Sequence, residues 1–317
     1  MSQHVDHAPS EDLGGLPTIA LVTPTYNHAH LLEQTMRSVL DQGYPRLEYV
    51  VVDGGSTDGT QELIEKYRPK LYAAISEPDR GPHDAIEKGF ALTGGRIMGW
   101  LNSDDVLLPG SLLLVGSLFR DFPEMRWLTG TYSAIDPIGR PVVTMQPPRW
   151  TRRHLLSPLA GRWISQTSTF WTRDLWEEAG GGFEDIWGKG DQRAFPHAFD
   201  FELWARFSRY ASLNTVNAPI GCHRHIHGQD GYVNLGAYLH YADVIRKRER
   251  PRTVKEWLES LVANASAPLG RFHLLTLEGA IAGAMGAPPL IVFDVPTYSF
   301  RRRRRLERLR RMLSRVV

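Results

Sequence analysis

The chain has 317 residues, of which 42% are hydrophobic, and a formal net charge of +2 at pH 7. A chain of this length and hydrophobic content can bury a substantial core, so we expect a globular protein of one large or two smaller domains. Its single cysteine, Cys222, excludes an internal disulfide framework and a cysteine-rich zinc site, and it fits the reducing cytoplasm.

The first half of the chain alternates between strand and helix patterns. Short apolar runs that end in polar turn residues predict buried strands within residues 18–27, 47–55, 71–81 and 97–101. Apolar residues at helical spacing between these runs predict helices at residues 30–41, about 58–67 and 82–92. Repeated strand and helix units of this kind favour a largely parallel sheet with right-handed crossovers. We assign residues 17–124 to this half, after a polar, disordered lead-in at residues 1–16 that lacks the apolar core of a signal peptide.

The alternation weakens in the second half. Residues 127–143 predict two strands joined by the turn "DPIG", and residues 168–183 predict a strand followed by a helix that ends in glycines. We therefore expect a mixed, antiparallel-leaning half over residues 125–239. Residues 240–317 predict a helical extension with a break at 266–270, and none of its apolar stretches approaches the roughly 20 residues that a membrane span needs.

Each predicted parallel strand ends on polar side chains. These are Thr25-Tyr26-Asn27, Asp53, the stretch from Glu77 to Arg80, and Asp104-Asp105. The carboxyl ends of parallel strands open onto one crevice, where ligands bind in open α/β sheets. A turn or a helix cap explains each group equally well when it is taken alone. Two adjacent carboxylates at a strand end also suit a hard divalent cation.

The order and spacing of these motifs carry further information. The stretches "TPTYN", "VVDGGSTDGT", "SEPDRGPHDAIEKGFALTGGRIMGWLNSDD" and "DFELW" resemble, in this order, those of family 2 inverting glycosyltransferases. The chain looks closest to the bacterial members that decorate cell-surface polysaccharide, and the resemblance covers about residues 17–230. It implies a GT-A fold, which is an α/β fold with a Rossmann-like, mostly parallel sheet and a mixed acceptor-side half.

The resemblance also implies a donor site. The base of a nucleoside-diphosphate sugar would be bound by Thr25, Tyr26, Asn27 and Asp53. Its diphosphate would be bound by Arg80 and Asp84, and its ribose or sugar by Asp104. Asp105, the last acid of the family's metal motif, would bind Mg²⁺ or Mn²⁺ that bridges the diphosphate and stabilises the charge of the leaving group. The family often has an acid where this chain has Asn102, so we do not expect Asn102 to be a metal ligand.

Inversion requires a general base that takes a proton from the acceptor hydroxyl. The stretch "AFDFELWARFSRY" offers Asp200 and Glu202, and the resemblance places the base at Asp200. An N-cap of the following helix is the alternative role for Asp200. The Gly-rich stretch before it is longer than is usual in the family and contains Asp185 and Asp191 as further carboxylates.

Three histidines alternate in the stretch "GCHRHIHGQDG". On a strand, His223, His225 and His227 would point the same way, which suits metal ligation, although an exposed polar face is the commoner explanation. Family members often carry a histidine before a Gly/Gln turn. The resemblance therefore implies that His227, rather than His225, lies near the metal or the diphosphate.

The segment "RWISQTSTFW" resembles the acceptor side of the family. Here Gln166 would contact sugar hydroxyls, and Trp163 or Trp171 would stack on a pyranose ring, although aromatic residues at strand spacing more often belong to a core.

We therefore expect a metal-dependent glycosyltransferase that moves a sugar from a nucleoside-diphosphate sugar to a hydroxyl of a glycan or lipid-linked acceptor, in surface polysaccharide synthesis. A non-catalytic nucleotide-sugar-binding protein is the alternative, and it would be expected to lose Asp105 or Asp200. A nicotinamide-dependent oxidoreductase would carry G-x-G-x-x-G after the first strand, where "TPTYNHAH" stands instead.

The charge of the chain is concentrated at its end. Residues 301–317 contain nine arginines and one glutamate, so the preceding 300 residues carry a net charge of −6, which argues against a specific nucleic-acid partner. Five apolar residues of this tail share one helical face: Leu306, Leu309, Met312, Leu313 and Val316. The pattern predicts peripheral attachment of a cytoplasmic protein to an anionic membrane surface through 301–317, with a solvated helix end or nonspecific nucleic-acid binding as alternatives.

Overall fold

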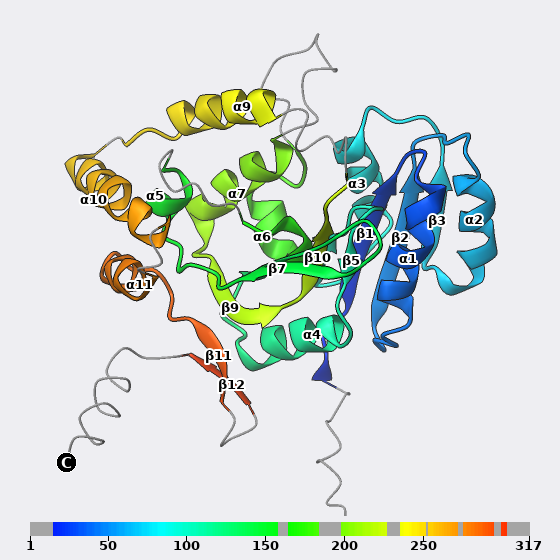
Figure 1. Cartoon of the computed structure of the whole chain (residues 1–317), viewed down its shortest axis with the longest axis horizontal. Coiled ribbons are helices and arrows are strands. Elements are labelled where there is room, and N and C mark those ends of the chain that lie inside the picture. Colours follow the sequence, from blue (N-terminus) through cyan, green and yellow to red (C-terminus); the bar gives the residue numbers. More distant parts are fainter. Residues whose placement is uncertain are drawn as a thin grey trace, which may run out of the picture.

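The structure of the chain, a computed structural model, describes residues 15–157, 164–183, 198–226, 235–251, 253–271, 275–294 and 299–302. One large sheet forms the centre of the fold, and helices cover both of its faces (Figure 1). Its main path has the strand order β12-β11-β9-β6-β8-β4-β1-β2-β3. The predicted α/β fold with a mixed, mostly parallel sheet is confirmed.

The first half is the parallel part of this sheet. Its strands, in the order β3-β2-β1-β4, are β1 (Ile19–Thr25), β2 (Leu47–Asp53), β3 (Ala73–Ser76) and β4 (Ile97–Trp100). Three helices connect them, namely α1 (Ala29–Leu40), α2 (Thr60–Tyr67) and α3 (Pro82–Ala91). Every residue of β1 is buried, because helices cover both faces of a parallel sheet, and this explains the unbroken apolar run in its sequence.

The second half is mixed, as its weaker alternation predicts. Strand β8 (Thr169–Thr172) lies antiparallel between β4 and β6 (Trp127–Ile135). Strands β6 and β7 (Pro141–Met145) form the predicted hairpin around "DPIG", and β9 (Asn214–Pro219) runs parallel to β6. Two short strands, β5 (Val106–Leu107) and β10 (Gly221–Arg224), pair with each other beside the end of β6. Helix α4 (Ser111–Asp121) completes the first half, and the described helices of the second half include α5 (Arg152–Leu155), α6 (Arg173–Glu178) and α7 (Phe199–Tyr210).

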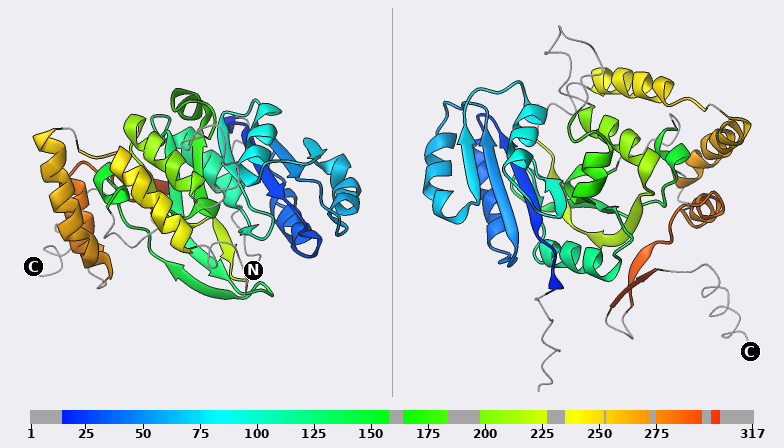
Figure 2. Two further views of the ribbon diagram at one scale, coloured as in Figure 1. Left: turned by 90° about the horizontal axis from the view of Figure 1, so that it is seen from above. Right: turned by 180° about the vertical axis from the view of Figure 1, so that it is seen from behind.

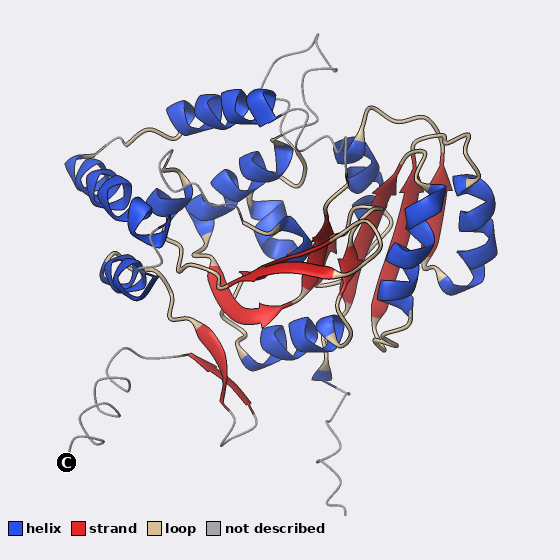
Figure 3. Ribbon diagram, viewed as in Figure 1, coloured by secondary structure: helices blue, strands red, loops and turns tan. Residues whose placement is uncertain are grey.

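The C-terminal extension is only partly helical, which corrects the prediction for residues 240–317. The described residues of this extension form three helices, α9 (Leu235–Arg248), α10 (Val254–Arg271) and α11 (Leu275–Ala284), and α10 runs through the break expected at 266–270. Packing of α10 against α5 and α11 outweighs the local preference of Pro268 and Gly270 to end a helix. Strands β11 (Ile291–Asp294) and β12 (Ser299–Arg302) then extend the sheet beyond β9 (Figure 3). This strand pairing is favoured because the run contains β-branched and aromatic residues, is too short for a helix and lies beside an open sheet edge.

Two hydrophobic clusters fill the two faces of the sheet. One contains a group of stacked and edge-on indoles, in which Trp100 and Trp204 lie 5.6 Å apart with ring planes at 5°. The other joins β1, β2 and β4 to residues of α1, α2 and α4. No helix in the described part of the chain is long and apolar enough to cross a membrane.

Helix α3 approaches β1 so closely that Gly89 has no room for a side chain. A Cβ atom built on Gly89 would lie 2.5 Å from Cγ1 of Val22. We predict that Gly89→Ala lowers the free energy of unfolding by about 1–3 kcal/mol, because the extra methyl group overpacks a buried contact. Gly94→Ala is the matched control, since its Cβ would meet no atom within 4 Å. Chemical denaturation of both variants measures the difference, and equal stability would show that α3 can move away from β1.

Candidate functional site

The ends of β1 and β2 meet at the carboxyl edge of the sheet, where Thr25 is the register partner of Asp53. Asp53 is fully buried, and its carboxylate accepts hydrogen bonds from the backbone N–H and the hydroxyl of Ser56 and, at 2.7 Å, from the hydroxyl of Ser76. These bonds fix the "GGS" turn after β2. The turn role expected for Asp53 is therefore present, and it holds the loop that faces the crevice.

The loop after β1 is bonded to the same turn. Asn27 has a positive φ of 53°, its N–H donates to Ser56 Oγ at 2.7 Å, and its side-chain oxygen accepts from Thr57 N at 2.9 Å. Tyr26, which lies between Thr25 and Asn27 in the sequence, is 62% exposed. Thr25 Oγ1 is buried, and none of the described residues hydrogen-bonds to it. The structure thus brings together the four residues predicted to surround a base, with one exposed ring and one unpartnered hydroxyl.

Arg80 and Asp84 form an ion pair at the start of α3. Arg80 Nη2 lies 2.8 Å from Asp84 Oδ1, and the backbone N–H of Arg80 donates to Asp84 Oδ2 at 3.1 Å. Burial by itself would raise the pKa of Asp84, but the hydrogen bonds and charge of Arg80 outweigh it, so this pKa is lowered. Asp84 is nearly buried, whereas the Arg80 side chain is 56% exposed. Asp84 therefore orients a guanidinium group that stays accessible to an anion.

The two adjacent acids after β4 differ from Asp53 in their surroundings. Asp105 is fully buried, and its Oδ1 accepts a hydrogen bond from the backbone N–H of Arg224 at 2.8 Å. Its Oδ2 has a single long contact among the described residues, 3.5 Å from the amide nitrogen of Asn102. Thr35 of α1 donates to the carbonyls of Ser103 and Asp105 and so holds the turn from below. One oxygen of Asp105 is thus held by the protein, while the other keeps free lone pairs.

Arg224 is a residue of this site that the sequence did not reveal. Its side chain is almost completely buried and donates to the backbone carbonyl of Asp104 at 2.8 Å and to Oε1 of Gln34 at 2.9 Å. It also reaches the carbonyls of Asp136 and Pro137 in the β6–β7 turn. A lone arginine among histidines gives no signal for this role, because its partners lie about a hundred residues away along the chain.

His223 and His225 lie edge-on, with ring centroids 5.5 Å apart, but they have different hydrogen-bond partners. The pairing of Cys222 with Val106 brings His223 beside the acids, with Nδ1 at 3.2 Å from Asp105 Oδ1. Burial opposes the charged form of His223, but the charge and hydrogen bond of Asp105 raise its pKa. His225 instead faces the hydroxyl of Tyr132 at 3.0 Å. His227 lies outside the described residues, so His223 is the imidazole that the structure places at Asp105.

Gln166 lies at the end of β4. Its amide donates to the carbonyl of Trp100 at 2.7 Å, and its side-chain oxygen lies 3.5 Å from the amide nitrogen of Asn102. Trp171 is fully buried among the core indoles, so the expectation that it stacks on a sugar ring is wrong. Trp163 lies outside the described residues.

The two carboxylates of α7 have different surroundings. Asp200 lies inside the first turn, and the N-cap is Ala198, so the N-cap alternative for Asp200 is wrong. Burial raises the pKa of Asp200 to about 6. Glu202 is buried and paired with Arg206 and Arg248, each at 2.8 Å. Glu202 is therefore a structural anion, and Asp200 is the carboxylate of this helix whose pKa is raised toward neutral pH. Asp185 and Asp191 lie outside the described residues.

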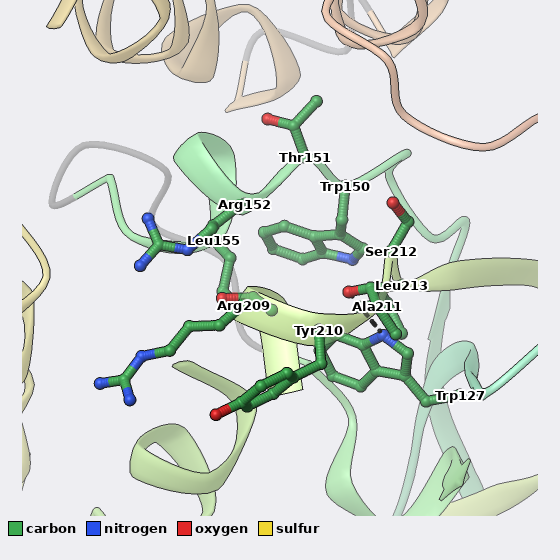
Figure 4. Close-up of a pocket in the computed structure, with 11 residues that line it drawn as sticks. Trp127, Trp150, Thr151, Arg152, Leu155, Arg209, Tyr210, Ala211, Ser212 and Leu213 are labelled. Carbon is green, nitrogen blue, oxygen red and sulfur yellow. Dashed lines mark hydrogen bonds between the residues drawn. The ribbon is translucent and has the colours of Figure 1, made fainter. Parts of the chain in front are cut away.

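The best-defined cavity lies elsewhere. It has a volume of about 190 Å³ between α5 and the end of α7, and Figure 4 shows the indoles of Trp127 and Trp150 on one side and the guanidinium groups of Arg152 and Arg209 on the other. Both arginines are paired with Glu249. None of the residues predicted for the site lines this cavity. The candidate site is therefore the open carboxyl edge of the sheet.

Sequence comparison finds similarity to one family over part of the first half of the chain. Residues 20–123 match the family model described as Glycosyl transferase family 2. Over 92 residues, 28% of this chain and 36% of its relative, the chain is 35% identical to a putative teichuronic acid biosynthesis glycosyltransferase, TuaG, of Bacillus subtilis. Over 228 residues, 70% of this chain and 22% of its relative, it is 25% identical to a hyaluronan synthase of Pasteurella multocida. The chain thus spans about a third or less of the length of these curated relatives.

The fold is also similar to solved structures. The mannosyltransferase PcManGT from Pyrobaculum calidifontis, in complex with GDP-Man and Mn²⁺, matches with a TM-score of 0.55 at 21% identity, over 88% of this chain and 76% of that chain. Residues 1–349 of S. aureus TarS, in complex with UDP-GlcNAc, match with a TM-score of 0.51 at 16% identity, over 91% and 97% of the two chains. These matches establish the GT-A fold.

The buried ion pairs of Glu202 give a test of its structural role. We predict that Glu202→Gln lowers the free energy of unfolding by about 3 kcal/mol, because it removes the buried anion that Arg206 and Arg248 share. Asp41→Asn, which breaks the exposed pair with Arg37, should cost less than about 0.5 kcal/mol. Urea unfolding followed by circular dichroism compares the two. A stable Glu202→Gln variant would reopen Glu202 as a candidate base.

Proposed function

We propose that this chain, whose residues 20–123 match the glycosyl transferase family 2 model and whose fold is GT-A, belongs to that family, and from that premise we propose the reaction that it catalyses. We propose an inverting, metal-dependent transfer of a sugar from a nucleoside-diphosphate sugar to a hydroxyl of a glycan or lipid-linked acceptor. The observation that carries this proposal is the gathering of Asp53, Arg80 and Asp105 at one edge of the sheet, together with a carboxylate of raised pKa at Asp200.

The donor binds along the carboxyl edge of the sheet. The base is surrounded by the hydroxyl of Thr25, the ring of Tyr26 and the loops of Asn27 and Asp53. The Thr25 hydroxyl supports this placement, because it has no hydrogen-bond partner among the described residues. The guanidinium of Arg80, held by Asp84, binds the diphosphate by charge-assisted hydrogen bonds. Asp104 lies next to Asp105 and approaches the ribose or the sugar. Solved neighbours with GDP-Man or UDP-GlcNAc are in keeping with a nucleotide-sugar donor.

The acids after β4 suit a divalent cation. Mg²⁺ and Mn²⁺ are commonly bound through one or two carboxylates, with substrate phosphates and water completing the shell. The free lone pairs of Asp105 Oδ2 and the nearby imidazole of His223 are suitable donors, and no larger cluster of His, Cys, Asp or Glu is present among the described residues. When bound, the cation would stabilise negative charge on the diphosphate leaving group. His227 stays a predicted second ligand.

Asp200 acts as the general base. Its pKa of about 6 leaves it mostly ionised at neutral pH, while burial keeps it basic enough to take the proton of the acceptor hydroxyl. Gln166, anchored to the end of β4, is placed to contact sugar hydroxyls beside the acids. A non-catalytic nucleotide-sugar-binding protein does not need a general base. The proposed base at Asp200 therefore disfavours that alternative.

The acceptor belongs to surface polysaccharide synthesis, a role that the relationship to a putative teichuronic acid glycosyltransferase supports. We place the reaction in the cytoplasm, at the inner face of the membrane, with residues 301–317 as a peripheral contact to anionic lipid. Of these, Arg301 and Arg302 belong to β12, and the remainder lies outside the described residues. The acidic body of the chain disfavours a specific nucleic-acid partner.

Asp105 allows a test of the cation. We predict that Asp105→Asn, which can still accept the hydrogen bond of Arg224, lowers turnover of the nucleotide sugar by a factor on the order of 10²–10³. It should also abolish the extra thermal stabilisation that Mn²⁺ gives in the presence of nucleoside diphosphate. Asp121→Asn, an exposed acid of α4, serves as the control. Full turnover of the native chain in EDTA would exclude metal dependence.

Asp200 allows a test of base catalysis. Because the base must be ionised, turnover should fall about tenfold for each pH unit below about 6 and stay level above it. Asp200→Asn should lower turnover by a factor on the order of 10²–10⁴ with unchanged donor affinity, while Asp243→Asn on the outer face of α9 should not. Released nucleoside diphosphate is measured across pH. An active Asp200→Asn variant would assign the base to another carboxylate.

A further inference from the structure

Helix α10 turns its large apolar side chains away from the protein. Val254 is 76% exposed and Trp257 54%, and Leu258, Leu261 and Val262 are between 45% and 52% exposed. Their spacing, 254, 257–258 and 261–262, repeats every three to four residues and places all five on one face of the helix. Single exposed apolar residues are common, but a helix face made of them marks a surface that binds something.

The orientation of α10 is fixed by polar contacts on its opposite face and along one flank. Glu256 is paired with Arg153 of α5 at 3.2 Å, and Asn264 accepts a hydrogen bond from Ser157 at 2.7 Å. Ala263, half a helical turn from the apolar face, is completely buried. Small and polar residues therefore face the protein and large apolar ones face outward, which is the reverse of an ordinary surface helix.

This apolar face lies at the periphery of the molecule. Figure 1 shows α10 at the end of the fold away from α1, α2 and α3, and the two views of Figure 2 agree. Helix α9, which leads to α10, also exposes two leucines, Leu235 and Leu239, at 45% and 46%. The face is thus remote from the nucleotide-binding half and open to a large partner.

We propose that α10 binds the surface of an anionic lipid bilayer, with its apolar face inserted among the lipids. The face contains a tryptophan, the residue most typical of membrane interfaces, among leucines and valines. Lys255 at its edge and Arg250 just before it are exposed, whereas the acids Glu256 and Glu259 are only partly exposed and Glu256 is paired with Arg153. This charge pattern complements anionic lipid, and two copies of the same basic-edged face would repel each other.

The membrane contact is independent of the proposed reaction and of the arginine tail. It uses residues 254–262, which include neither the donor residues nor Asp200, and which the structure describes in full. Loss of this contact should leave nucleotide-sugar turnover in solution unchanged. Turnover in solution therefore separates a failure of this inference from a failure of the proposed function.

The test is co-sedimentation of the full chain with phosphatidylcholine vesicles that contain or lack phosphatidylglycerol. The native chain should bind the anionic vesicles, and Trp257→Gln combined with Leu261→Gln should weaken this binding by a factor on the order of ten or more, because two inserted side chains are lost. The matched control is Ile138→Gln combined with Val142→Gln, which removes exposed apolar residues from the β6–β7 hairpin. Circular dichroism and turnover in solution verify that all variants are folded.

Three outcomes would overturn the inference. The first is that the native chain does not bind anionic vesicles, and the second is that the α10 variant binds as well as the native chain. The third is a dimer, seen by analytical ultracentrifugation, that the α10 substitutions dissociate and the hairpin substitutions do not. That result would assign the face to a second copy of the chain.

Discussion

The guanidinium group of Arg224 holds the candidate site together. The group is buried and donates hydrogen bonds to the carbonyl of Asp104, to the turn between β6 and β7 and to the side chain of Gln34 in α1. The backbone N–H of Arg224 donates to the carboxylate of Asp105. Arg224 joins Asp104 and Asp105 to the β6–β7 turn of the second half, so the geometry of the acids depends on the second half being folded.

The same principle recurs on the other side of the molecule. Glu202 in α7 is paired with Arg206 and with Arg248 of α9, and the neighbouring Glu249 takes hydrogen bonds from Arg152 and Arg209. These pairs connect the helix of Asp200 to α9 and α5. The C-terminal extension is therefore bonded to the helix of the proposed base and forms one body with it.

The parts of the fold that were predicted correctly are those that local sequence determines. The β1–β4 and α1–α3 units follow from apolar periodicity and turn residues, and the β6–β7 hairpin follows from "DPIG". The roles of Arg224, His223 and Glu202 could not be predicted, because each depends on a partner in another element. Arg224 and its partner Asp105, for example, are 119 residues apart in the sequence. Strand β11 was missed for a similar reason: its apolar run is short, and it becomes a strand because β9 offers it an unpaired edge.

The position of β8 has a consequence for how the protein is made. This strand lies between β4 and β6, yet it is synthesised after both, and its Phe170 fills the space beside Gly99 so closely that a Cβ atom there would lie 2.8 Å away. At a translation rate of about 5–20 residues per second, the roughly 70 residues between β4 and β8 take several seconds to emerge from the ribosome. During that interval the nascent chain carries an unpaired β4 edge and an unfilled indole core, which makes it a client for chaperones that shield apolar strands.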